Sequence, residues 1–199
     1  MPDTQQNLAA LLGSRICHDL ISPLGAIGNG VELLAMDGAA SGPELSLISE
    51  SVDNANARIR FFRVAFGAAA AGQQVARREI ISILSDYQKS ARVNIGWEVA
   101  QDPPRQRTKL AFLLLQCLEV AMPYGGKVTI SEKPGRWTVQ GTGDKLRIDP
   151  ALWEVLSNPN AAHEVGAAEV QFALVPPMLA MTKCKLTVEI SETDITASF

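Results

Sequence analysis

The sequence predicts an α+β protein, helical in its N-terminal part and mixed in its C-terminal part. Two observations favour this class. Before residue 72, two long segments place apolar residues every three or four positions, which is the period of an amphipathic helix. After residue 77, short alternating runs typical of strands are interleaved with helical segments. We therefore expect a helical domain at residues 1–72 and an α/β sandwich domain at residues 73–199.

The N-terminal part predicts an antiparallel helical hairpin. A first helix is expected over residues 4–36, with Pro23 as its one internal proline, and turn formers follow at residues 37–43. A second apolar stripe then runs to Phe66 and ends in the alanine-rich stretch 67–72. Two helices alone leave part of both stripes in water, so we expect two copies to pair as a four-helix bundle. The alternative is that the hairpin folds against its own C-terminal half.

The C-terminal part predicts helices on one face of a sheet, with antiparallel strands after residue 125. The prolines Pro176 and Pro177 are expected to interrupt the last helix. The helices are expected at residues 79–91, 109–122, 151–157 and 162–181, and the strands at residues 94–100, 127–132, 136–140, 146–148, 186–190 and 194–199.

Composition excludes several classes of function. The chain has 199 residues, of which 47% are hydrophobic and 20% charged, so it should fold. A net charge of -3 and scattered basic residues argue against a nucleic-acid partner. The three cysteines, Cys17, Cys117 and Cys184, show no metal-ligand spacing and are expected to be reduced thiols. With no secretory leader pattern and no apolar run near ~18 residues, we expect a cytoplasmic protein without a membrane partner.

One histidine of the first helix stands out by its position. With about 100° of rotation per residue, Ser22, Gly25 and Asn29 fall within about 40° of His18, on the face opposite the apolar residues of this helix. A reachable imidazole of near-neutral pKa can take up and release a phosphoryl group. A lone helical histidine is more often a solvated surface residue, so this geometry alone does not assign chemistry.

The residues around His18 resemble a known motif. Residues 15–27 read RICHDLISPLGAI, similar to the His-acidic-Leu-x-x-Pro-Leu run in the H box of dimeric histidine-kinase hairpins. The resemblance implies that His18 is the phospho-acceptor and that Asp19 orients or deprotonates its imidazole. It also makes Ser22 the polar residue one turn on and Pro23 a kink in the helix.

The layout of the C-terminal part resembles the Bergerat ATPase domain of histidine kinases, but the nucleotide motifs are missing. Gln116 lies in the helix where a kinase places its asparagine, and the segment Val139-Gln140-Gly141-Thr142-Gly143 lacks the leading aspartate. No glycine-rich lid precedes the last helix. An intact acceptor hairpin joined to such a degenerate domain resembles the alphaproteobacterial ChpT-type histidine phosphotransferases over almost the whole chain.

This resemblance implies a homodimeric phosphorelay intermediate without autokinase activity. It would accept a phosphoryl group on His18 from the receiver domain of a hybrid histidine kinase and pass it to response regulators. No cofactor or metal of its own is expected, because the Mg²⁺ would belong to the receiver's acidic pocket. Docking is expected at Ser22, Gly25 and Asn29, with Arg58 and Phe62 of the second helix as further candidates.

Two alternatives remain open at this point. An ATP-dependent histidine kinase with a divergent nucleotide pocket would explain the layout of the C-terminal part. A scaffold that binds receivers without being phosphorylated would explain a dimer and leave His18 without a function.

Overall fold

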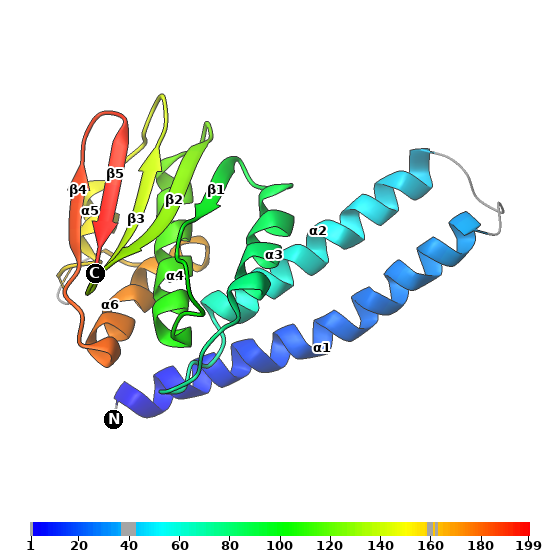
Figure 1. Cartoon of the computed structure of the whole chain (residues 1–199), viewed down its shortest axis with the longest axis horizontal. Coiled ribbons are helices and arrows are strands. Elements are labelled where there is room, and N and C mark those ends of the chain that lie inside the picture. Colours follow the sequence, from blue (N-terminus) through cyan, green and yellow to red (C-terminus); the bar gives the residue numbers. More distant parts are fainter. Residues whose placement is uncertain (1, 37–42, 159–160, 162) are drawn as a thin grey trace. The chain divides into compact units, whose positions relative to one another are not determined.

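The computed structural model describes residues 2–36, 43–158, 161 and 163–199 (Figure 1). Contacts divide the chain into two units. We call Met1–Ala68 together with Ile83–Ser90 the hairpin unit, and Ala69–Ser82 together with Ala91–Phe199 the sheet unit. Ile83–Ser90 is expected from the sequence in the C-terminal part, whereas the contacts of this segment lie with the hairpin.

The hairpin consists of α1 (Pro2–Met36) and α2 (Pro43–Ala65), and α1 runs through residue 23 without a break. Small residues allow the helices to approach closely. A Cβ added at Gly13 would lie 3.6 Å from the Cβ of Phe66, and one at Gly28 would lie 3.4 Å from the Cγ1 of Val52. These contacts define an antiparallel register in which position 18 lies level with residues 61 and 62.

The C-terminal end of α3 (Arg77–Gln88) packs against the C-terminal part of α2. Tyr87 stacks on Phe61, with ring centroids 4.1 Å apart and planes inclined by 19°. Phe61 is fully buried, as expected for a large aromatic ring between two helices. A third helix therefore helps to form the core of the hairpin unit.

The sheet unit contains five strands in the order β1-β2-β3-β5-β4 (Figure 1). The helix α4 crosses over between β1 and β2, which are parallel, and the remaining neighbours are antiparallel. The elements are β1 (Val93–Trp97), α4 (Arg105–Ala121), β2 (Gly126–Lys133), β3 (Arg136–Thr142), α5 (Pro150–Glu154), η1 (Ala167–Glu169), α6 (Val170–Thr182), β4 (Thr187–Ile190) and β5 (Asp194–Ser198).

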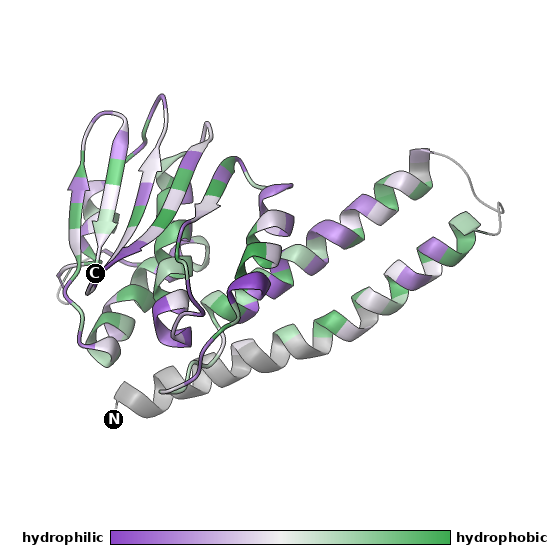
Figure 2. Ribbon diagram, viewed as in Figure 1, coloured by the Kyte–Doolittle hydropathy of each residue, from purple (hydrophilic) through white to green (hydrophobic). Residues whose placement is uncertain are grey.

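The core of this unit lies between the sheet and its helices. The run 110–115 of α4 is fully buried, as its uninterrupted apolar sequence predicts. Strand β3 alternates buried residues with exposed or half-buried ones. Figure 2 shows hydrophobic and hydrophilic residues mixed along the strands of the sheet. The mixed α+β class expected from the sequence is confirmed.

Two expectations for the C-terminal part are wrong. Residues 146–148 are not a strand, because the backbone N–H of Arg147 donates to the carbonyl of Ala121 at the end of α4 instead of joining a ladder. The last helix begins at Val170, after the short η1, and continues through Pro176 and Pro177. Burial of Phe172 and Val175 on the same helix holds it together despite the missing donors.

Candidate functional site

The residues that face α2 define the orientation of α1. Cys17 is 7% exposed and Gly28 touches Val52, so both lie on the line along which α1 contacts α2. Each further residue turns the helix by about 100°. Residues 18 and 29 directly follow Cys17 and Gly28 in the sequence, so both are turned by this angle from the contact line. They therefore lie on one side of the hairpin, which we call the acceptor side.

The described surface on the acceptor side is open. Ser22 and Asn29 are exposed, and a Cβ added at Gly25 would meet nothing within 4 Å among the described residues. The structure thus brings together three of the predicted docking residues on the helix that carries His18. The side chains of His18 and Asp19 lie outside the described part of the structure.

The other two predicted docking residues lie elsewhere. The half-buried Phe62 packs edge to face on Phe61 at 6.2 Å and contacts Phe66 at 5.4 Å. Arg58 is exposed, and its Cζ lies 6.0 Å from the ring centroid of Tyr87 on α3. The helical period turns both residues away from the acceptor side.

The side of the hairpin next to Phe62 is apolar. Leu20, Ile27 and Leu34 repeat every seven residues on α1 and are 45%, 50% and 49% exposed. Ile48, Ala55 and Phe62 repeat with the same spacing on α2. We call these six residues the apolar stripe. A seven-residue repeat on two antiparallel helices is the pattern of a bundle interface.

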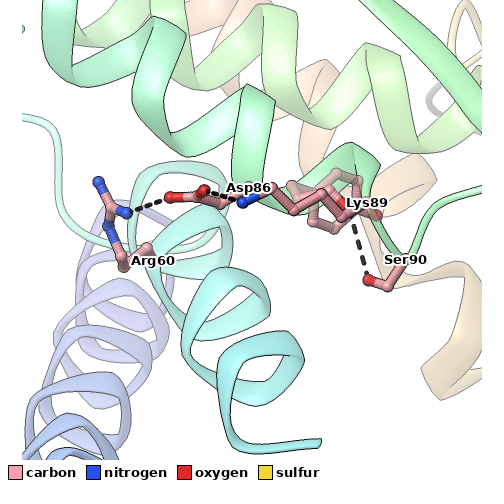
Figure 3. A network of polar contacts seen from close by, with 5 residues as sticks. Arg60, Asp86, Lys89 and Ser90 are labelled. Carbon is pink, nitrogen blue, oxygen red and sulfur yellow. Dashed lines mark hydrogen bonds and ion pairs between the residues drawn. The ribbon is translucent and has the colours of Figure 1, made fainter. Parts of the chain in front are cut away.

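An ion pair that the sequence does not predict joins α2 to α3. Nη1 of Arg60 lies 2.8 Å from Oδ2 of Asp86, and Nζ of Lys89 lies 3.0 Å from Oδ1 of the same carboxylate (Figure 3). Arg60 directly follows Ile59, a buried residue on the α1-facing side of α2. The sequence gives no indication of this pair because its two residues lie 26 positions apart, on different helices.

Cys17 has a perturbed thiol beside the acceptor position. Burial raises the pKa of Cys17 above the usual value, and the charge of Arg63 partly opposes this effect. Because burial dominates, the thiol is held in its neutral form. Cys17 therefore acts as a packing residue on the contact line.

The positions of the missing nucleotide motifs are filled by side chains. A Cβ added at Gly141 would lie 2.9 Å from Cδ2 of Leu118 and 3.1 Å from Cε of Met122, both on or next to α4. Oε1 of Gln116 is buried and has no hydrogen-bond partner among the described residues. Apolar side chains of α4 and the residue after it thus pack against Gly141 of β3, in the segment compared with the kinase nucleotide motif in the sequence.

The described residues contain no group of three or more His, Cys, Asp or Glu residues that could hold a metal ion. None of the helices in the same part of the chain is long and apolar enough to cross a membrane. Cys17, Cys117 and Cys184 are free cysteines in the structure.

Comparison with known proteins decides between the families. Residues 77–194 match the family described as the histidine phosphotransferase C-terminal domain. The protein phosphotransferase ChpT of Brucella abortus (strain 2308) is 37% identical over 171 residues, which are 83% of this chain and 81% of the relative. The chain belongs to the histidine phosphotransferase family.

A solved structure agrees with this assignment. A bacterial phosphotransferase is 33% identical to this histidine phosphotransferase and superposes with a TM-score of 0.69, covering 96% of this chain and 94% of the other. The resemblance to the ChpT-type histidine phosphotransferases is thereby confirmed.

Proposed function

We propose that this histidine phosphotransferase carries a phosphoryl group on His18, received from the receiver domain of a hybrid histidine kinase and passed to response regulators. The observation that supports this most directly is the open acceptor side of α1. On this side, Ser22, Gly25 and Asn29 lie within and just after the segment that resembles the H box, and none of them has a large side chain. A folded donor can approach such a surface closely enough for in-line attack.

The transfer of the phosphoryl group requires no nucleotide. An imidazole nitrogen of His18 attacks the phosphorus of the receiver's aspartyl phosphate, an N–P bond forms, and the acyl O–P bond breaks. The aspartate leaves as a carboxylate and its Mg²⁺ stays in the receiver pocket. Asp19 is the candidate group that orients the imidazole or takes its proton. Transfer to a response regulator is the reverse reaction on a second receiver.

The packing around Gly141 disfavours the kinase alternative. Leu118 and Met122 leave no room for even one added carbon at Gly141 without moving. The sequence also lacks the asparagine and the leading aspartate of the kinase motifs, and residues 77–194 match a phosphotransferase family. We therefore propose that the sheet unit needs no nucleotide in this function.

The apolar stripe supports a homodimer. Three of its large side chains on α1 are about half exposed in a single chain, and they form a continuous seam at heptad spacing. Pairing with a second copy would bury them in a four-helix bundle and leave both acceptor sides open. We place this dimer in the cytoplasm, where its free cysteines would remain reduced.

Incubation with a phosphorylated receiver tests the function. Label should move to the wild-type chain and to His163→Ala, and it should not move to His18→Ala. His163 is a matched control because it is the second of two histidines in the chain. A folded wild-type chain that binds the receiver but takes no label would support the scaffold alternative. Label from ATP alone would support the kinase.

A further inference from the structure

We propose that Arg60 binds the phosphoryl group on His18, exchanging its partner Asp86 for the phosphate when the histidine is phosphorylated. This inference rests on the proposed function and adds a second residue to the acceptor site. Arg60 binds the phosphoryl group in the phosphorylated state and Asp86 in the resting state.

The register of the hairpin places Arg60 at the level of the acceptor. The contacts of Gly13 with Phe66 and of Gly28 with Val52 set position 18 opposite residues 61 and 62. Arg60 is one to two residues from this level. Neighbouring packed helices lie about 8–10 Å apart, a gap that a long arginine side chain can span.

Arg60 also lies on the same side of the hairpin as position 18. Cys17 and Ile59 are buried on the line where α1 and α2 meet, with 7% and 9% of their surfaces exposed. Position 18 and Arg60 each come one residue later, so both are turned about 100° in the same sense. In an antiparallel pair, equal turns from the contact line lead to the same side. Arg60 therefore flanks the acceptor side, whereas Arg58 does not.

The ion pair with Asp86 is suited to exchange. Both side chains are about one-third exposed, at 34% and 35%, so water screens their attraction. A phosphoryl group carries nearly two negative charges and accepts the planar fork of an arginine. Asp86 keeps Lys89 as a partner at 3.0 Å when Arg60 leaves (Figure 3). The exchange therefore leaves no isolated charge.

The charges of the hairpin are unevenly distributed along the chain. Residues 20–57 contain five acidic residues and no Lys, Arg or His. The cations of the hairpin helices therefore lie outside this segment, at Arg15 on α1 and at Arg58, Arg60 and Arg63 on α2. Among these, Arg60 lies within one to two residues of the level of position 18 and on the same side of the hairpin, where it can balance the charge of a phosphoryl group.

The test uses a small donor, so that no receiver is required. Phosphoramidate would label His18 in the purified full chain, and ³¹P NMR would follow the phosphoryl signal as the pH is varied. A nearby guanidinium lowers the phosphoryl pKa. We expect Arg60→Ala to raise this pKa by about one unit, a tenfold change in the dissociation constant, and Arg60→Lys to restore part of it.

Asp86→Asn separates this role from a structural one. It loosens the hold on Arg60 and should lower the phosphoryl pKa, opposite to Arg60→Ala. Lys89→Ala removes the other partner of Asp86 and should raise the phosphoryl pKa, because Asp86 then holds Arg60 more strongly. If Arg60 only tied α2 to α3, Arg60→Ala and Asp86→Asn would both destabilise the fold and neither would move the titration. A titration unaffected by Arg60→Ala, or moved in the same direction by Asp86→Asn, overturns the proposal. A wild-type chain that takes no label at His18 contradicts the acceptor role itself.

Discussion

The packing of neighbouring residues determines on which side of the hairpin position 18 lies. Cys17 and Gly28 seat α1 against α2, and the next residue in each case lies on a side with small neighbours such as Gly25. The local motif allows His18 to be proposed as the acceptor from the sequence alone, because residue types and spacing are read directly from residues 15–27. Arg60 could not be predicted, because its place depends on the register of two helices and on α3.

A buried lysine makes a separate prediction for stability. Lys109 on α4 is 6% exposed, and burial, with a further contribution from Arg105, lowers its pKa to about 8. An ordinary lysine has a pKa of about 10.4. Between these values the unfolded chain binds a proton that the folded chain does not, so the free energy of unfolding should rise with pH.

Lys109→Met should flatten this rise, because the variant has no titrating group at the site. Urea unfolding at several pH values between about 7 and 10 measures the difference between variant and wild type. The difference should change steadily above pH of about 8. A constant difference across the range would show that Lys109 is not responsible.

At the scale of elements, α3 shows what a sequence pattern can and cannot predict. Its apolar face correctly predicted a helix, since Ile80, Ile83, Leu84 and Tyr87 are all buried. The pattern could not show that the segment Ile83–Ser90 packs with the hairpin, because a stripe of apolar residues does not identify what covers it.

The errors in the C-terminal part have a similar cause. Residues 146–148 have the composition of a strand but bond to the end of α4. Two prolines predicted an interruption of the last helix, yet tertiary packing keeps α6 continuous. In both cases a contact distant in sequence outweighed local preference.

The turn between α4 and β2 makes a prediction at this scale. Gly125 has a φ of +91°, and a Cβ there would lie 2.6 Å from the carbonyl oxygen of Arg92. Gly125→Ala should therefore lower the free energy of unfolding through both backbone strain, about 1–2 kcal/mol, and a clash with rigid main chain.

Gly135→Ala is the matched control. Gly135 has a φ of +78° in the turn between β2 and β3, and an added Cβ would meet nothing within 4 Å among the described residues. This variant should show the strain alone. Urea unfolding that gives equal losses for the two glycines would contradict the tight contact at Gly125.

At the scale of the whole molecule, the apolar stripe predicts assembly. Ile27→Glu combined with Leu34→Glu should convert a dimer into a monomer, because charge at half-exposed seam positions would be buried without a partner. Sedimentation equilibrium measures the change. Leu33→Glu is the control, since Leu33 is 62% exposed but lies off the stripe. A wild-type monomer, or a double variant that remains dimeric, would contradict this interface.

The central claim is that His18 carries the phosphoryl group, and mapping that group tests it most directly. The chain has two histidines, which proteolysis separates into different peptides. After incubation with a phosphorylated receiver, mass spectrometry at alkaline pH should find acid-labile phosphate on the peptide that contains His18. Phosphate on the His163 peptide, or on neither peptide while the receiver loses its label to solvent, would contradict the account.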